Sequence, residues 1–311
     1  MKIKRVIFLS SLLIFLGSCN QNSQNTSNKV NDKPQVVSTS TIIANLTEEI
    51  GGEEIDNISI LQAGADPHIY EPVPQDTIAL EKADLILYNG YNLEPNIIKL
   101  INSTGIKGEK LAVGEQIKPL DFEHKGQKRP DPHVWGNAQN GIIMVKAIRD
   151  KLIEIDPENQ GKFTENAAKL IEELQELDSW IKVQIATIPP NQRKLITSHD
   201  AFQYYSNAYG LEIPGTLIGI STEEQPSAQT IKNLVEIIRN SGVKAIFAET
   251  TINPTLIETV AQESKVKVAQ DKLYSDSISV KGTEADSYVK MLKVNTRTIV
   301  NALADNSDQP Q

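Results

Sequence analysis

The segment that decides the fold reads DPENQGKFTENAAKLIEELQELDSWIKVQIATIPP, from Asp156 to Pro190. Its apolar residues recur at steps of three and four, the spacing of one face of an α-helix. These residues are Phe163, Ala167, Leu170, Leu174, Leu177, Ile181 and Ile188. Asp156 suits the N-cap and Pro157 the first helical position, whereas the prolines at 189 and 190 end the helix. A helix from Pro157 to Ile188 would be about 48 Å long, enough to span the whole molecule.

Apolar β-branched runs alternate with amphipathic segments on both sides of this helix. The runs before it are VVSTS (36–40), ISILQAG (58–64) and LILYNGY (85–91). Those after it are RKLITS (193–198), GTLIGI (215–220), VKAIFAET (243–250) and KVAQDKLY (267–274). Strands alternating with helices predict parallel βαβ units. Because βαβ segments flank it on both sides and only four heptads are present, we expect a helix packed along both lobes, not a coiled coil.

The sequence therefore predicts an α/β fold in which one long rigid helix bridges two βαβ lobes, each with a mostly parallel sheet. The first lobe is expected at residues 35–155, the linking helix at 156–189 and the second lobe at 190–311. The last helix is expected at about 284–304.

The first 34 residues have a different composition. Lys2, Lys4 and Arg5 precede an apolar run that is too short to cross a bilayer, and the run ends at a small-residue site before Cys19. This pattern predicts a signal peptide at 1–18 and a lipobox, in which Cys19 becomes the lipid-anchored first residue. An ordinary signal that happens to contain a cysteine is the alternative. The polar stretch that completes 19–34 has too few apolar residues to fold, and we expect it to be a solvated tether.

The composition of the chain argues against some classes of partner and of metal site. The chain has 311 residues with a formal net charge of −9, and its leader is positively charged, so the mature protein is more acidic still. An acidic surface disfavours nucleic acid as a partner. With the single cysteine acylated, disulfides and thiolate metal sites are excluded. We expect an exported, lipid-anchored monomer on the periplasmic or extracellular face of a membrane.

The chain has only four histidines, and two of them occupy one repeated phrase. His68 lies in GADPHIYEP and His133 in DPHVW, whereas His199 follows the run RKLITS. In open α/β sheets, ligands bind at the carboxyl ends of the strands, where these loops are expected. Asp276, in LYSDS, occupies the loop after the last run of the second series. We expect the segment DFEHKGQKRP (121–130) to be a polar loop and assign no role to its histidine, His124.

Such a set suits a divalent transition metal, which binds neutral imidazole nitrogens and a carboxylate. Pro67 and Pro132 stiffen the chain before the two histidines of the repeated phrase. Asp66 and Asp131 either cap their turns or accept a hydrogen bond from an imidazole, and the residue type favours capping.

From Gln35 to Ala304 the chain resembles the TroA-like, cluster A-I family of metal-binding lipoproteins of ABC importers. The phrases that carry the resemblance occur in order: GADPHIYEP, ADLILYNGYNLEP, DPHVW, TSHDAFQYYSNAYG, STEEQPSAQ, FAETTINPTLIETVA, LYSDSIS and YVKMLKVNTRTIV. The resemblance implies two α/β lobes bridged by one long helix, with a metal site in the cleft between them. It implies four metal ligands, His68, His133, His199 and Asp276, with Glu249 supporting a ligand. WGNAQN departs from the family pattern after the tryptophan, which affects the start of the following helix.

The resemblance implies a solute-binding lipoprotein that captures Zn²⁺ or Mn²⁺ and delivers it to the permease of an ABC transporter with its ATPase. Three imidazoles with one carboxylate suit zinc, whereas manganese prefers more oxygen ligands. The usual His-rich loop of zinc binders is not present, so both metals stay open. Four protein ligands fill a tetrahedral shell, whereas catalytic zinc keeps one position for water, so we expect no enzyme. The alternatives are an adhesin-type lipoprotein with a structural metal and an exported zinc hydrolase that uses Glu249 or Asp276 as base.

Overall fold

The computed structural model describes residues 33–103, 105–124 and 127–304. The predicted signal peptide, Cys19 and nearly all of the predicted tether lie outside the described residues. Within the described ranges, no helix combines the length and the low polarity needed to cross a bilayer.

A four-stranded parallel sheet forms the centre of the first lobe, the part of the chain before the long helix. Its strands are β1 (Gln35–Ser38), β2 (Asp56–Ser59), β3 (Leu85–Tyr88) and β4 (Glu109–Ala112), in the spatial order β2-β1-β3-β4. Side chains alternate between the two faces of a strand. Leu85 and Leu87 accordingly belong to one hydrophobic cluster and Ile86 to another. Both faces of the sheet are therefore covered, as a parallel sheet requires.

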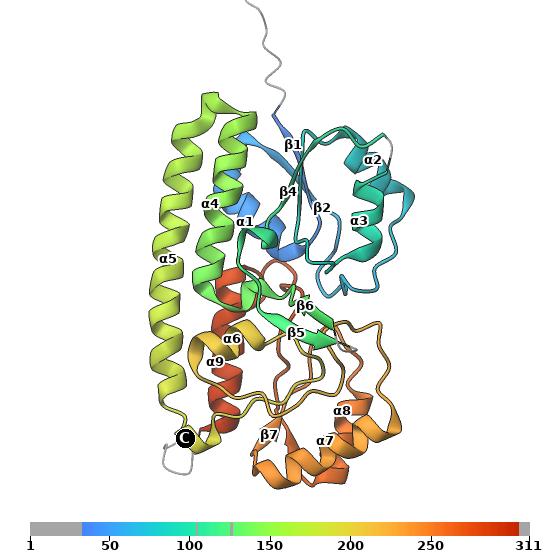
Figure 1. Ribbon diagram of the computed structural model, residues 1–311. Coiled ribbons are helices and arrows are strands. Elements are labelled where there is room, and N and C mark those ends of the chain that lie inside the picture. The colour runs from blue at the N-terminus through green and yellow to red at the C-terminus, as the bar shows by residue number, and fades with distance from the viewer. Residues whose placement is uncertain (1–32, 104, 125–126, 305–311) are drawn as a thin grey trace, which may run out of the picture. The chain divides into compact units, whose positions relative to one another are not determined.

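Helices cover each face of this sheet (Figure 1). They are α1 (Thr41–Gly51), α2 (Pro74–Lys82), α3 (Pro95–Ile101) and α4 (Ala138–Ile155). α4 begins inside WGNAQN (135–140), at Ala138, because the Asn137 side chain accepts the Gln139 N–H at 2.9 Å and caps the helix. The interpretation of 121–130 as a polar loop was wrong, since β5 (Asp121–His124) and β6 (Gln127–Pro130) pair as an antiparallel hairpin. Short 3₁₀ turns occur at Gly52–Glu54, Gly114–Gln116 and Val134–Gly136.

The long helix predicted between the lobes is α5, Gln160–Ala186. It is shorter than predicted, because Pro157–Asn159 forms a separate 3₁₀ turn before it and the α-helix ends two residues before Ile188. At 1.5 Å per residue its length is about 40 Å. It packs against α1 and α4 of the first lobe and against α9 (Tyr288–Leu303) beyond them (Figure 1). The bridging role predicted for it is thereby confirmed.

The second lobe, the part of the chain after α5, has less regular strands than predicted. Its elements are a 3₁₀ turn at Pro190–Gln192, α6 (Gln203–Tyr209), α7 (Ala228–Ser241), β7 (Ala245–Ile246), α8 (Thr255–Ser264), β8 (Lys267–Val268) and α9. The runs 193–198 and 215–220 form no continuous strands. They contribute single parallel bridges such as Thr197 with Phe247 and main-chain bonds such as Ile218 N–H to the Ser198 carbonyl. Pro214, Gly215 and Gly219 fall in this region, and such residues interrupt a ladder.

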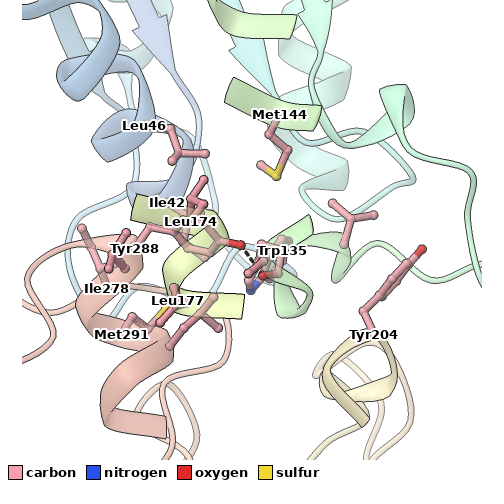
Figure 2. Packing of buried hydrophobic residues seen from close by; sticks show 14 of the residues in the cluster. Ile42, Leu46, Trp135, Met144, Leu174, Leu177, Tyr204, Ile278, Tyr288 and Met291 are labelled. Carbon is pink, nitrogen blue, oxygen red and sulfur yellow. Dashed lines mark hydrogen bonds between the residues drawn. The ribbon is translucent and has the colours of Figure 1, made fainter. Parts of the chain in front are cut away.

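One hydrophobic cluster runs through α1, α4, α5 and α9 and so joins the two lobes. Figure 2 shows residues from both lobes and from α5 around Trp135, among them Ile42, Leu177 and Met291. The Tyr288 hydroxyl donates to the Trp135 carbonyl at 2.6 Å, which places a polar bond inside this core. Two smaller clusters lie beneath α2 and α3 and beneath α7 and α8.

Candidate metal site

The structure brings together the four side chains predicted as metal ligands. His68 lies in the loop between β2 and α2, and His133 directly precedes the 3₁₀ turn that leads into α4. His199 lies between the bridge at Thr197 and α6, whereas Asp276 follows the bridge at Leu273. Two of them therefore come from each lobe, and all four are buried.

The ring nitrogens and the carboxylate converge on one point. One ligand atom from each of the four residues can be chosen so that all lie within 4.8 Å of one another. His68 Nε2 is 3.2 Å from His133 Nε2. The two oxygens of Asp276 lie 3.5 Å from His133 Nε2 and 3.4 Å from His199 Nε2. With metal–nitrogen bonds of 2.0–2.1 Å, the edge of a regular tetrahedron is about 3.4 Å. These three distances are close to that value, and the two that involve Asp276 end on different oxygens of its carboxylate.

Two of the three imidazole rings have a carboxylate on the side away from this point. Asp131 Oδ1 lies 2.8 Å from His133 Nδ1, and Glu249 Oε2 lies 2.5 Å from His199 Nδ1. Each carboxylate also accepts the backbone N–H of its histidine, at 3.0 and 2.8 Å. A partner on Nδ1 fixes the tautomer and the ring orientation of a metal-binding histidine. The Nε2 atoms of both rings are thus the ones presented to an ion.

Asp66 has a different environment from Asp131, although each precedes Pro-His. Its Oδ1 accepts the His68 N–H at 2.9 Å, which caps the turn, and its Oδ2 accepts the Thr222 hydroxyl at 2.6 Å. Asp131 both caps its turn and contacts its imidazole. The capping role predicted for both residues is present, and only Asp131 adds the ring contact.

Burial and neighbouring charges shift the pKa of three of the four clustered side chains. Burial lowers the pKa of His68 to about 3, with smaller contributions from His133 and His199, so this imidazole is neutral at pH 7. Burial also opposes the charged form of His199, but Glu249 and Asp276 outweigh it and raise the pKa of His199 well above its ordinary value. Burial alone would raise the pKa of Asp276, but His199 and the other imidazoles hold that pKa below its usual range. A metal ligand must be deprotonated, so a cation could bind the His199 ring only by displacing its proton.

A cavity of about 390 Å³ reaches the site from the His68 side. Tyr91, Asn92 and Glu115 line it from the first lobe, and Ile220, Ser221 and Glu224 from the second. Of the four predicted ligands, His68 is the one in its wall. An ion entering from this cavity meets His68 first, while His133 and His199 lie deeper.

Several residues that support the site were not identified from the sequence. The indole N–H of Trp135 donates to the Ser275 carbonyl at 2.8 Å, next to Asp276. The Tyr204 hydroxyl donates to the Asp131 carbonyl at 3.0 Å and accepts the Leu120 N–H at 2.9 Å. The aromatic residue that closes DPHVW was a visible signal for the first contact. Nothing in the sequence near Tyr204 indicated the second, because its partner is 73 residues away.

Comparison with known proteins gives the same picture over nearly the whole chain. The family profile described as "Zinc-uptake complex component A periplasmic" matches residues 36–302. The metal ABC transporter substrate-binding lipoprotein SsaB of Streptococcus sanguinis is 36% identical over 97% of this chain and 99% of its own length. The manganese ABC transporter substrate-binding lipoprotein scaA of Streptococcus gordonii is 35% identical over 97% and 99%.

The fold is shared with a solved structure. The periplasmic zinc binding protein TroA from Treponema pallidum superposes with a TM-score of 0.84 at 32% identity, covering 88% of this chain and 100% of that one. The profile and the relatives cover the linking helix and both lobes together. The chain therefore belongs to the zinc-uptake complex component A family, whose members are substrate-binding proteins of ABC transporters and not enzymes.

Proposed function

We propose that this protein captures one Zn²⁺ or Mn²⁺ ion with His68, His133, His199 and Asp276 and delivers it to the permease of an ABC importer. The observation that carries the proposal is the convergence of three imidazoles and one carboxylate, all buried, from two lobes. Four protein ligands leave no position of a tetrahedral shell for water, which favours capture over catalysis. An ion held between two lobes is released when the lobes move apart.

The descriptions of similar proteins support zinc in one case and manganese in another. The Treponema protein is described as zinc binding and the Streptococcus gordonii protein as a manganese transporter component. Ligand softness favours zinc for a site with three imidazoles. The Irving–Williams order lets zinc displace manganese in vitro, so the ion carried in the cell has to be measured on protein taken from its native envelope. Elemental analysis of that material identifies the transported ion.

The partners follow from the same assignment. The relatives are named lipoproteins of ABC transporters, which supports a permease with its ATPase as the partner of this chain. We include in the proposal a signal peptide at 1–18, acylation of Cys19 and a polar tether before the first lobe at 35–155. The linking helix at 156–189 and the second lobe at 190–311 complete this domain organisation.

Calorimetric titration with Zn²⁺ and with Mn²⁺ tests the ligand set. The double variant His68→Ala/His199→Ala removes one imidazole from each lobe and is expected to abolish stoichiometric binding. His124→Ala is the matched control, because it removes the one histidine outside the proposed set, and we expect wild-type affinity. Unchanged stoichiometry and affinity in the double variant would show that the ligand assignment is wrong.

A further inference from the structure

The turn that carries His68 is hydrogen-bonded to the second lobe at two points. At one point, Asp66 Oδ2 accepts the hydroxyl of Thr222 at 2.6 Å. At the other, the Gly64 N–H donates to Ser277 Oγ at 2.9 Å. Thr222 and Ser277 are both more than 150 residues away from this turn, so only the approach of the two lobes makes these bonds.

The bond to Ser277 belongs to a small, partly buried network in which each proton has a defined place. The Ser277 hydroxyl donates to the Ile278 carbonyl at 2.9 Å, so its oxygen can only accept from its other neighbours. Thr41 Oγ1 lies 3.1 Å from Ser277 Oγ and accepts the Ile278 N–H at 3.1 Å. The Thr41 proton therefore goes to Ser277. Ser277 itself is buried, so loss of its partners would leave its hydroxyl oxygen less well paired.

Both contacts involve residues that are next to a proposed metal ligand in the sequence or are hydrogen-bonded to one. Asp66 bonds Thr222 with one carboxylate oxygen and the His68 N–H with the other, so a single group joins the second lobe to the main chain of this histidine. Ser277 follows Asp276 in the sequence. The other two imidazoles have a carboxylate on Nδ1, whereas His68 is supported through its main chain and from across the cleft.

His68 also stands between the site and the cavity. Ser221, next to Thr222, lines this cavity together with His68. For an ion to leave by this route, the His68 turn and the loop around Thr222 must separate. The two interlobe bonds must then break before the ion is free.

We propose that Thr222 and Ser277 are positioning residues that hold the His68 turn in its ligand-binding place and so set the rate at which the metal ion leaves. The inference rests on the proposed metal site. These bonds exist only with the lobes closed. Their loss accelerates dissociation and leaves the association rate unchanged, because the ion reaches the open protein before the bonds form.

The test is chelator-induced release of Zn²⁺ from the loaded full chain, followed by stopped-flow spectroscopy, together with the association rate. Thr222→Val removes the hydroxyl at nearly constant volume and is expected to raise the dissociation rate about fivefold, which corresponds to a net hydrogen bond of about 1 kcal/mol. Thr222→Ser keeps the hydroxyl and should restore the wild-type rate within twofold. Ser277→Ala, on the other contact, is expected to act in the same direction as Thr222→Val.

Thr259→Val is the matched control, since it makes the same change on the exposed face of α8, where the hydroxyl donates to the Thr255 carbonyl of its own helix. A dissociation rate within twofold of wild type in both Thr222→Val and Ser277→Ala overturns the inference. An equally faster dissociation in Thr259→Val also overturns it. So does a loss of affinity in the two variants that comes entirely from a slower association rate. A wild-type protein that binds neither Zn²⁺ nor Mn²⁺ would instead overturn the proposed function itself.

Discussion

Glu94 offers a sharp test of the electrostatics of the first lobe. Its carboxyl is buried in the loop after β3, with 1% of the residue exposed. Oε1 accepts the Asn89 N–H at 2.7 Å and the Thr39 hydroxyl at 2.8 Å, whereas Oε2 has no hydrogen-bond partner among the described residues. Burial raises the pKa of Glu94 to about 7 from an ordinary value of 4.5, and the two hydrogen bonds oppose it only in part.

The sign of the pH effect follows from proton binding. Between pH 4.5 and 7 the folded protein holds a proton on Glu94 and the unfolded chain does not. The free energy of unfolding therefore falls as the pH rises through this window, and the stability from this group is fully present only below the unfolded pKa. A difference of about 2.5 pKa units corresponds to about 3 kcal/mol.

Glu94→Gln removes this titration and keeps an oxygen that can accept the bonds from Asn89 and Thr39. Urea unfolding of the metal-free protein, measured from pH 4.5 to 8, gives the stability of the variant relative to wild type. The free energy of unfolding of the variant minus that of wild type should rise by about 3 kcal/mol between pH 4.5 and 8. Glu176→Gln makes the same substitution on the exposed face of α5 and serves as the control. A flat profile for Glu94→Gln as well would refute the reasoning.

Two further predictions concern packing and capping in α4. In Gly141→Ala the new Cβ would lie 2.7 Å from a ring carbon of Tyr288, which should cost about 1–3 kcal/mol. Gly161→Ala in α5 meets no heavy atom within 4 Å and should gain up to about 1 kcal/mol; equal effects in urea unfolding would contradict this account. Asn137→Ala removes the cap of α4 and should cost about 1 kcal/mol in thermal unfolding, whereas Asn137→Asp keeps an acceptor and should stay close to wild type.

The helices were predictable because their signals are local. The repeat from Phe163 to Ile181 gave the buried face of α5, and the last helix, expected at about 284–304, is α9, Tyr288–Leu303. Strands depend on distant partners, and here the sequence pattern was less informative. β4 and the β5–β6 hairpin were missed, and two runs of the second lobe proved to be bridges instead of strands.

The sequence by itself determined which residues gather at the site, since the two Asp-Pro-His phrases, TSHD and LYSDS each end up at its centre. Only the tertiary structure decided what each residue does there. Asp66 and Asp131 stand in the same tripeptide, yet Asp131 contacts its imidazole and Asp66 bonds to Thr222. The physical reason is that the same tripeptide lets each aspartate cap its own turn, by accepting the N–H of the histidine two residues on. Its remaining capacity to accept hydrogen bonds is used by whichever group the rest of the fold brings within reach.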